Sequence, residues 1–149
     1  MSPPWPERLR HVVVEGPIGA GKTSLVRRLA AELEGEVLLE DPGSNPFLAA
    51  FYDDPTRHAL PTQLFFLFQR VDQLRALRQG DLFRRVCFSD FFFEKDPLFA
   101  ALTLADEELT LYRKIYDHLA PQAPAPDLVI YLQASPRTLM ARVRRRGVD

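Results

Sequence analysis

Cysteine is nearly absent from this chain of 149 residues, which contains Cys87 alone. One thiol cannot form an internal disulfide, and it excludes a metal site built from cysteines. Cys87 lies in the apolar run V-C-F, so we interpret it as a buried structural thiol.

The chain also lacks a long hydrophobic run and an excess of charge of either sign. No apolar stretch reaches the roughly 20 residues that a membrane-spanning helix needs, and residues 1–10 contain no apolar segment typical of a signal peptide. The formal net charge is −1, which gives no support to binding of nucleic acid or of a membrane surface through bulk electrostatics. We therefore expect a cytoplasmic protein with neither of these partners.

Length and composition favour one compact domain. Hydrophobic residues make up 46% of the chain, which is enough to bury a core. We expect a mobile, proline-rich lead over residues 1–10 and a single domain over residues 11–149.

The chain does contain a phosphate-binding loop. The apolar β-branched run Val12–Val14 predicts a buried strand, the next segment matches G-x-x-x-x-G-K-[ST], and apolar residues at helical spacing follow. Glycines let backbone N–H groups converge on an anion, and a helix starting there points the positive end of its dipole at the same place. The sequence therefore predicts ATP binding by Gly16, Pro17, Ile18, Gly19, Ala20, Gly21, Lys22, Thr23 and Ser24.

Two side chains of this loop have distinct predicted roles. Lys22 would reach the β- and γ-phosphates, and the Thr23 hydroxyl would ligate Mg²⁺. The alternative is a glycine-rich turn that binds nothing, which a full motif between a strand and a helix disfavours.

The pattern along the chain alternates strands with helices. We expect a first helix to about Leu33 that stops near Gly35, and a long amphipathic helix over Pro61–Gln79. Asp106 would be the N-cap of a helix to Leu119, and Ser135-Pro136 would cap and begin a last, basic helix. Expected strands cover 36–40, 85–89 and 127–132, and a short helix or turn covers 47–52. This order predicts a three-layer α/β P-loop sandwich with a parallel sheet flanked by helices.

Acidic residues follow two of the expected strands. Glu40 and Asp41 end one strand, and Asp90 ends another. In a parallel α/β sheet, ligands bind beyond the carboxyl ends of the strands. A kinase needs one carboxylate that accepts a proton from the attacking hydroxyl and another that helps to hold Mg²⁺, and Glu40 and Asp90 suit these tasks. The alternative is that these are ordinary solvated loop acids.

Several blocks of the sequence resemble the deoxynucleoside kinases, most closely the bacterial members that act on purine deoxynucleosides. They are GPIGAGKT, EDPGSNPFLAAFYDDP, QLFFLFQR, SDFFFEKDPLFA and RVRRRG, in the family's order. The resemblance implies phosphorylation of a deoxynucleoside 5′-hydroxyl by ATP and Mg²⁺ in nucleotide salvage. It also implies a homodimer, because family members are often dimers.

The same resemblance implies roles for residues of the nucleoside site. Glu40 would be the general base, although matching the acid-proline pair would place this role on Asp41. Gln63 would hydrogen-bond the base edge and Arg70 would orient the base. The remaining implied substrate residues are Tyr52 for the sugar 3′-hydroxyl, Asp90 after the third strand, and Asp96 for the base.

The sequence departs from the family in two places. Phe91 stands where the family has an arginine after the acid, and Lys95 is a candidate to restore that charge. In the arginine-rich lid, Arg142 and Arg146 match as catalytic residues, while Val148 replaces the last arginine. Arg144 and Arg145 either compensate for that loss or form a solvated helix end.

The chain stops at Asp149, inside the implied lid, where the family continues with a helix, a fifth strand and a loop over the adenine. We therefore expect a fragment or a truncated product that lacks the C-terminal part of the fold. Two alternatives to an active deoxynucleoside kinase stay open. One is a nucleoside monophosphate kinase of the thymidylate type, and the other is a nucleotide-binding fragment with little activity.

Overall fold

The computed structural model describes residues 9–17, 19–78 and 85–145. The chain divides into two compact units. The first, here called the sheet unit, comprises Met1–Leu39, Leu82–Phe92 and Ala125–Asp149. The second, the helical unit, comprises Glu40–Asp81 and Phe93–Pro124. A single kinase domain over residues 11–149 stays a prediction.

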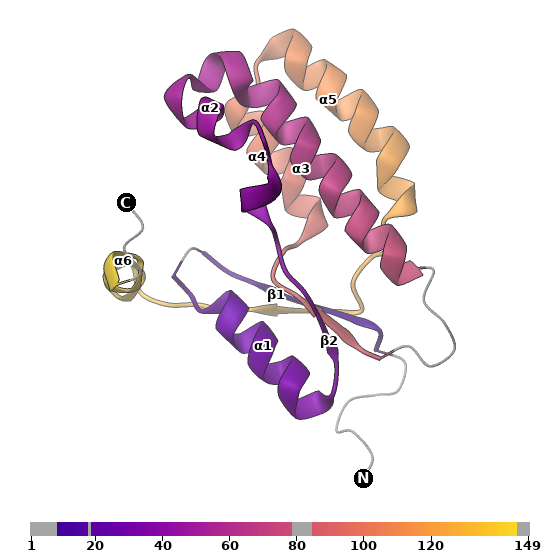
Figure 1. The fold of residues 1–149 in the computed structure, drawn as a ribbon, viewed down its shortest axis with the longest axis vertical. Helices are drawn as coiled ribbons and strands as arrows, with labels where there is room; N and C mark the ends of the chain where they lie inside the picture. The colour runs from indigo at the N-terminus through magenta and orange to yellow at the C-terminus, as the bar shows by residue number, and fades with distance from the viewer. Residues whose placement is uncertain (1–8, 18, 79–84, 146–149) are drawn as a thin grey trace. The chain divides into compact units, whose positions relative to one another are not determined.

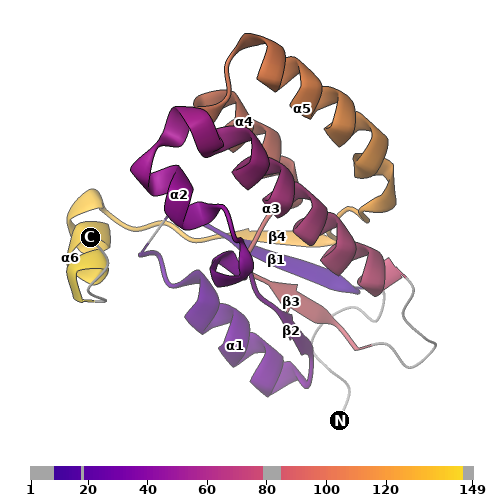
Figure 2. The ribbon, with the colours of Figure 1, turned by 45° about the horizontal axis from the view of Figure 1, so that its top comes forward.

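The sheet unit is built on four parallel strands in the order β2-β3-β1-β4. These are β1 (His11–Glu15), β2 (Glu36–Leu38), β3 (Cys87–Ser89) and β4 (Leu128–Tyr131), which lie side by side in Figure 2. The central strand β1 pairs with β3 on one side and with β4 on the other. The structure thus confirms the predicted α/β class with a parallel sheet, and it places the phosphate loop directly after a central, fully buried strand.

The core of the sheet unit lies between the sheet and α1 (Lys22–Leu33), which runs along it in Figure 1. Val12 and Val14 face α1 because alternate residues of a strand point to the same side. They pack with Phe88 of β3 and with Val26 and Ala30 of α1, all of them buried. This packing fixes the start of α1, and therefore the loop that precedes it.

The last helix of the sheet unit is α6 (Pro136–Arg145). Its N-cap is Ser135, as predicted, since the Ser135 Oγ accepts the Thr138 backbone N–H at 3.2 Å.

The helical unit contains α2 (Leu48–Asp53), α3 (Pro55–Arg78), α4 (Asp96–Thr103) and α5 (Asp106–Leu119). The long helix α3 contacts the other three, and α4 also contacts α5. Short 3-10 turns cover Pro42–Ser44, Phe93–Lys95 and Ala120–Gln122. Within the described residues, no helix has the length and apolar character that crossing a membrane requires.

Several element boundaries differ from those expected, and three of them are described here. Helix α3 begins at Pro55, and Pro61 lies inside it rather than at its start. Thr62, which follows Pro61, makes a hydrogen bond within the helix: its hydroxyl donates to the His58 carbonyl at 2.7 Å. Asp106 is the first residue of α5 and not its N-cap; that position is taken by Ala105, which makes no side-chain cap. Strand β2 ends at Leu38, so Glu40 follows the strand rather than ending it.

Gly35 owes its identity to a close approach of chain segments. A Cβ built at Gly35 would lie 2.6 Å from the Val86 carbonyl oxygen and 2.8 Å from the Phe88 ring. The segment after α1 therefore lies too close to β3 for any side chain. Helix α1 ends at Leu33, as predicted, but the left-handed residue that closes it is Glu34 (φ 54°) rather than Gly35.

We expect Gly35→Ala to destabilise the fold by about 1–3 kcal/mol, because the added methyl group must displace the Val86 backbone just before β3. Urea unfolding followed by circular dichroism measures this loss. Gly43→Ala is the matched control, since a Cβ there would meet only the Asp41 Oδ1, at 3.8 Å. Equal unfolding midpoints for the two variants would contradict this view of Gly35.

Candidate functional site

The phosphate loop places its predicted metal ligands together. Lys22 is the first residue of α1, and the preceding Gly21 has φ 94°, a left-handed conformation that favours glycine. The Thr23 hydroxyl donates to the Asp90 Oδ2 at 2.8 Å. A hydroxyl and a carboxylate at this spacing are hard oxygen ligands of the kind Mg²⁺ prefers. Ile18 lies outside the described residues.

Mg²⁺ would need more ligands than the described side chains supply. No cluster of three or more His, Cys, Asp or Glu suited to a metal occurs in residues 9–17, 19–78 and 85–145. This fits the usual magnesium site of a phosphotransferase, in which one or two protein oxygens hold the ion and phosphate oxygens and water complete its shell. Thr23 and Asp90 are thus the residues that would hold Mg²⁺.

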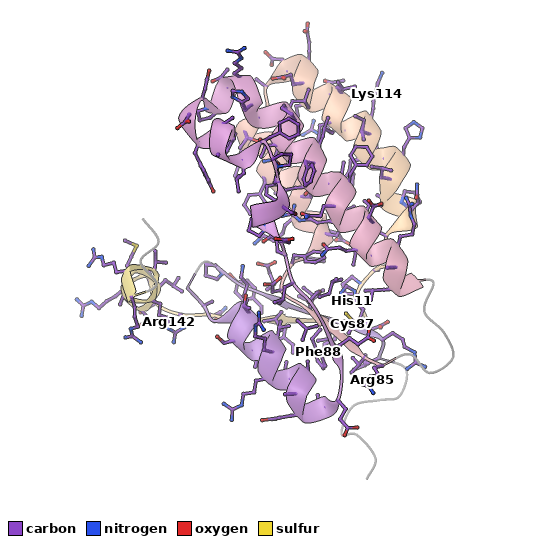
Figure 3. The ribbon with its side chains drawn as sticks, viewed as in Figure 1. His11, Arg85, Cys87, Phe88, Lys114 and Arg142 are labelled. Carbon is purple, nitrogen blue, oxygen red and sulfur yellow. The ribbon has the colours of Figure 1, made fainter. Side chains whose placement is uncertain are left out.

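Two more side chains bond the backbone of the loop. The buried carboxylate of Glu15 accepts the Gly16 N–H at 2.7 Å. The Arg142 guanidinium on α6 donates to the carbonyls of Gly19 at 3.0 Å and Ala20 at 3.2 Å. Figure 3 shows Arg142 on α6, and the structure therefore brings this predicted lid arginine to the phosphate loop. Arg146, the second predicted lid arginine, lies outside the described residues.

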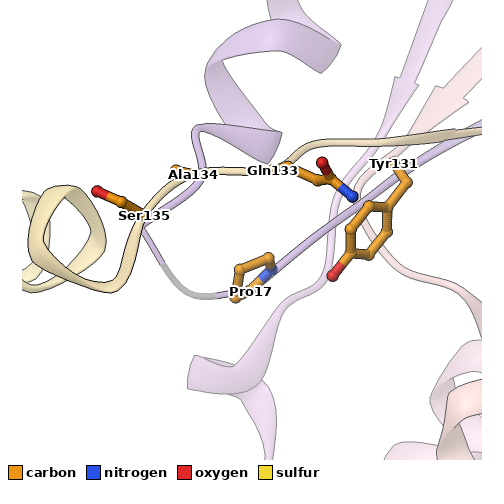
Figure 4. Close-up of a pocket in the computed structure, with 5 residues that line it drawn as sticks. All are labelled: Pro17, Tyr131, Gln133, Ala134 and Ser135. Atoms are coloured by element: carbon orange, nitrogen blue, oxygen red, sulfur yellow. The ribbon is translucent and has the colours of Figure 1, made fainter.

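A cavity of about 430 Å³ opens beside the phosphate loop within the sheet unit. Figure 4 shows its lining residues, which come from the loop, from the end of β4 and from the segment after it. They are Pro17, Tyr131, Gln133, Ala134 and Ser135. Of these, only Pro17 was predicted to contact ATP.

A second polar group supports the strand that precedes Asp90. The His11 Nε2 lies 2.8 Å from the Ser89 Oγ, and both residues are buried. Burial lowers the pKa of His11 to about 4, against the opposing charge of Asp127, so the ring is neutral near pH 7. Cys87 is buried as predicted, and burial raises the pKa of its thiol to about 12. His11 and Cys87 lie along the sheet in Figure 3.

The helical unit brings four of its polar residues into one cluster around Arg70. The Arg70 Nη2 donates to the Glu40 Oε1, and the Arg70 Nη1 donates to the Asp96 Oδ1. The Tyr112 hydroxyl donates to the Asp96 Oδ2. We call these four residues the Arg70 cluster. The structure thus places together three of the residues predicted for the nucleoside site.

The electrostatics of the Arg70 cluster follow from its burial. Asp96 is 1% exposed, and burial raises its pKa while the charge of Arg70 and the hydrogen bond from Tyr112 oppose that rise. Burial also raises the pKa of Tyr112, and the Asp96 carboxylate raises it further, so the phenol keeps its proton. For Arg70, burial lowers the pKa, but the carboxylates of Asp96 and Glu40 outweigh it and the pKa is raised. Arg70 is therefore a permanent cation between two acids.

The structure separates the two candidates for the general base. Glu40 pairs with Arg70. Asp41 is exposed, and its backbone carbonyl accepts a hydrogen bond from the Gln69 Nε2 at 3.3 Å. Gln69 also donates to the Ser44 Oγ at 2.5 Å. Consecutive residues of α3 thus hold consecutive residues after β2, and the carboxylate in the Arg70 cluster is that of Glu40.

Other predicted residues lie outside these contacts. Gln63 is on α3 with Arg70 and is 8% exposed, and its carboxamide bonds no residue in the described part of the chain. Tyr52 is 71% exposed, with its ring beside that of Phe51. The Lys95 Nζ lies 5.4 Å from the centre of the Phe99 ring. The Ser24, Arg144 and Arg145 side chains are exposed on α1 and α6.

Sequence reasoning missed the lining residues Tyr131, Gln133 and Ala134, and it also missed Glu15 and Tyr112. Only a weak feature of the sequence points to Glu15, namely that it is an acid at the end of an apolar strand. None points to Tyr112, because a tyrosine among the apolar positions of an amphipathic helix is typical of the core.

Comparisons with known proteins agree with this geometry. A family model described as deoxynucleoside kinase matches residues 12–149. The chain is 35% identical over 137 residues to a deoxyguanosine kinase of Bacillus subtilis, which covers 91% of this chain and 66% of that protein. It is 31% identical to a deoxyadenosine kinase of Dictyostelium discoideum, over 93% of this chain and 58% of that protein. The chain thus spans only about two thirds or less of the length of these relatives.

Solved structures share the fold. A deoxyadenosine kinase from M. mycoides with bound dATP superposes with a TM-score of 0.74 at 24% identity, over 92% of this chain and 72% of that one. The same enzyme with dCMP and a flexible dCDP gives a TM-score of 0.75. At this identity the likeness supports the fold alone.

We expect Arg70→Met to destabilise the protein by about 3–5 kcal/mol, since it leaves Asp96 as a buried charge without its cation. The loss is measured by urea unfolding. Without Arg70, the pKa of Asp96 rises further above its value in the unfolded chain, so the folded variant binds a proton more tightly. Its deficit relative to wild type should therefore be full at neutral pH and shrink as the pH falls.

Arg57→Met is the control for this variant, because Arg57 is an exposed arginine on the same helix. Its effect should stay within about 0.5 kcal/mol. Adding Asp96→Asn to Arg70→Met should recover part of the loss. An Arg70→Met variant as stable as Arg57→Met would contradict the buried-charge argument.

Proposed function

The chain belongs to the deoxynucleoside kinase family, and we propose that it transfers the γ-phosphoryl group of ATP to the 5′-hydroxyl of a deoxynucleoside, with a purine deoxynucleoside preferred. One observation carries the proposal furthest. Arg70 holds two acids in one buried cluster. Glu40 is the candidate general base, and Asp96 is the candidate acid for recognition of the nucleobase. A protein that only binds a nucleotide has no need to fix a carboxylate beside a second polar recognition group.

The donor half of the reaction rests on the phosphate loop. Lys22 and the N–H groups at the start of α1 neutralise the charge that builds on the transferred group. Mg²⁺, when held by Thr23 and Asp90, supplies further neutralisation of the phosphate oxygens. Arg142 adds a cation at the same loop, where its guanidinium already bonds the carbonyls of Gly19 and Ala20.

The acceptor half rests on Glu40. The Glu40 side chain is 35% exposed, so a substrate hydroxyl can reach it. Arg70 holds the carboxylate in one orientation, and this carboxylate accepts the proton of the 5′-hydroxyl. The hydroxyl oxygen then attacks the γ-phosphorus, the bond to the β-phosphate oxygen breaks, and ADP leaves.

The preference for a purine rests on Gln63, Arg70 and Asp96. A carboxamide offers a donor and an acceptor side by side, and the Gln63 side chain is nearly buried without a partner among the described residues. Such a group discriminates between bases because the wrong base leaves it unpaired. The relatives' names support purines, since they are a deoxyguanosine kinase and a deoxyadenosine kinase.

Three further properties stay predictions. They are a contact between Tyr52 and the sugar 3′-hydroxyl, a homodimer and a cytoplasmic location. Phe91, which follows Asp90 at the position where a kinase of the thymidylate type would have an arginine, argues against that alternative. The other alternative, a nucleotide-binding fragment with little activity, is tested by the phosphate-transfer assay below.

We expect Glu40→Gln to lower kcat by on the order of 10²–10⁴-fold, because the amide cannot accept the proton. The KM for ATP should stay near its wild-type value. The measurement is steady-state transfer of labelled phosphate from ATP to deoxyadenosine and deoxyguanosine.

Asp41→Asn is the matched control, because it makes the same change one residue away in an exposed side chain. It should keep near-native turnover. If turnover falls in Asp41→Asn and does not fall in Glu40→Gln, Asp41 rather than Glu40 is the general base. A wild-type chain without measurable transfer would favour the fragment with little activity.

A further inference from the structure

The Tyr112 hydroxyl is held in one place within the helical unit. Tyr112 is 0% exposed, and its ring stacks on that of Tyr116 with centroids 6.2 Å apart. Tyr116 in turn stacks on Phe93 at 5.3 Å. The hydroxyl donates to the Asp96 Oδ2. A phenol fixed by ring packing is a directional donor, and here its acceptor is a residue of the proposed nucleoside site.

Asp96 receives a different donor on each of its oxygens. Tyr112 bonds Oδ2, and Arg70 bonds Oδ1. The two bonds together set the plane of the carboxylate, which lies in the first turn of α4, where the helix dipole favours an anion. Without the phenol hydroxyl, Asp96 would keep one donor, and its carboxylate would be free to rotate about that bond.

Arg70 connects Asp96 to Glu40 through two nitrogens of one guanidinium. The guanidinium is planar and rigid, so a tilt that follows Asp96 at Nη1 also redirects Nη2, which bonds Glu40. The Phe66 ring lies 5.0 Å from the Arg70 Cζ and packs against the same group. The contacts thus form an unbroken series from Tyr112 through Asp96 and Arg70 to Glu40.

We propose that Tyr112 is a positioning residue whose hydroxyl, through Asp96 and Arg70, orients Glu40 and couples recognition of the base to proton removal. This inference rests on the proposed function. A nucleobase that pairs with Asp96 or Arg70 holds these contacts in place and aligns the Glu40 carboxylate. A nucleobase that pairs poorly leaves Glu40 less well aligned. The wrong deoxynucleoside therefore has a lower kcat as well as a higher KM.

The test compares Tyr112→Phe with Tyr116→Phe. Both changes remove one phenol hydroxyl from α5 and keep the ring, but only Tyr112 bonds Asp96. Tyr112→Phe should lower kcat/KM for the preferred deoxynucleoside by about tenfold or more, the effect of a lost hydrogen bond to a charged group. It should also narrow the difference in kcat between preferred and poor bases, with the KM for ATP unchanged. Tyr116→Phe should match wild type.

A second measurement separates positioning from a general structural role. In a Glu40→Gln background, Tyr112→Phe should cause no further loss of kcat, because the group that it orients is already gone. A structural role would give the same loss in both backgrounds. Thermal unfolding of both phenylalanine variants confirms that they are folded.

Two failures are distinguishable. If the wild-type protein phosphorylates deoxynucleosides and Tyr112→Phe behaves like Tyr116→Phe, or its loss persists in the Glu40→Gln background, the positioning role is wrong. If the wild-type protein phosphorylates no deoxynucleoside, the proposed function fails and this inference fails with it.

Discussion

A buried guanidinium needs negative partners, and the Arg70 side chain is only 12% exposed. An unpaired charge in such a place would cost several kcal/mol, so the fold must hold carboxylates against it. Glu40 and Asp96 meet that need, and Tyr112 meets the further need of Asp96, which has almost no contact with water. The same bonds that satisfy a buried charge also give three functional groups fixed orientations. Stability and the proposed chemistry thus depend on one set of contacts.

The sheet unit follows a different principle, because its predicted phosphate site is built on the backbone at the start of a helix. Packing of Val12, Val14 and Phe88 against α1 fixes the position of its N-terminus. N–H groups and the helix dipole at such a terminus favour an anion. Side chains at this terminus make separate contacts, as the bond from Thr23 to Asp90 illustrates.

The sequence was enough to predict what local patterns and a family resemblance specify. The phosphate loop, the end of α1 at Leu33, the cap at Ser135 and the proximity of Arg70 to Asp96 are of this kind. Tyr112 could not be predicted, since its amphipathic position is also that of a core aromatic and its partner is on another helix. The start of α3 was missed because a proline is typical of a helix boundary. Here Pro61 lies inside the helix, which contacts α2, α4 and α5.

We propose that this member of the deoxynucleoside kinase family selects its nucleobase through Gln63 and the Arg70 cluster. The most direct measurement is a competition assay with labelled ATP, all four deoxynucleosides and thymidine monophosphate, with Lys22→Ala as the inactive control. We expect transfer to a purine deoxynucleoside, and in Gln63→Ala a relaxed preference among nucleobases with an unchanged KM for ATP. Preference for thymidine monophosphate, or a nucleobase preference that Gln63→Ala leaves unaltered, would contradict the proposed selection.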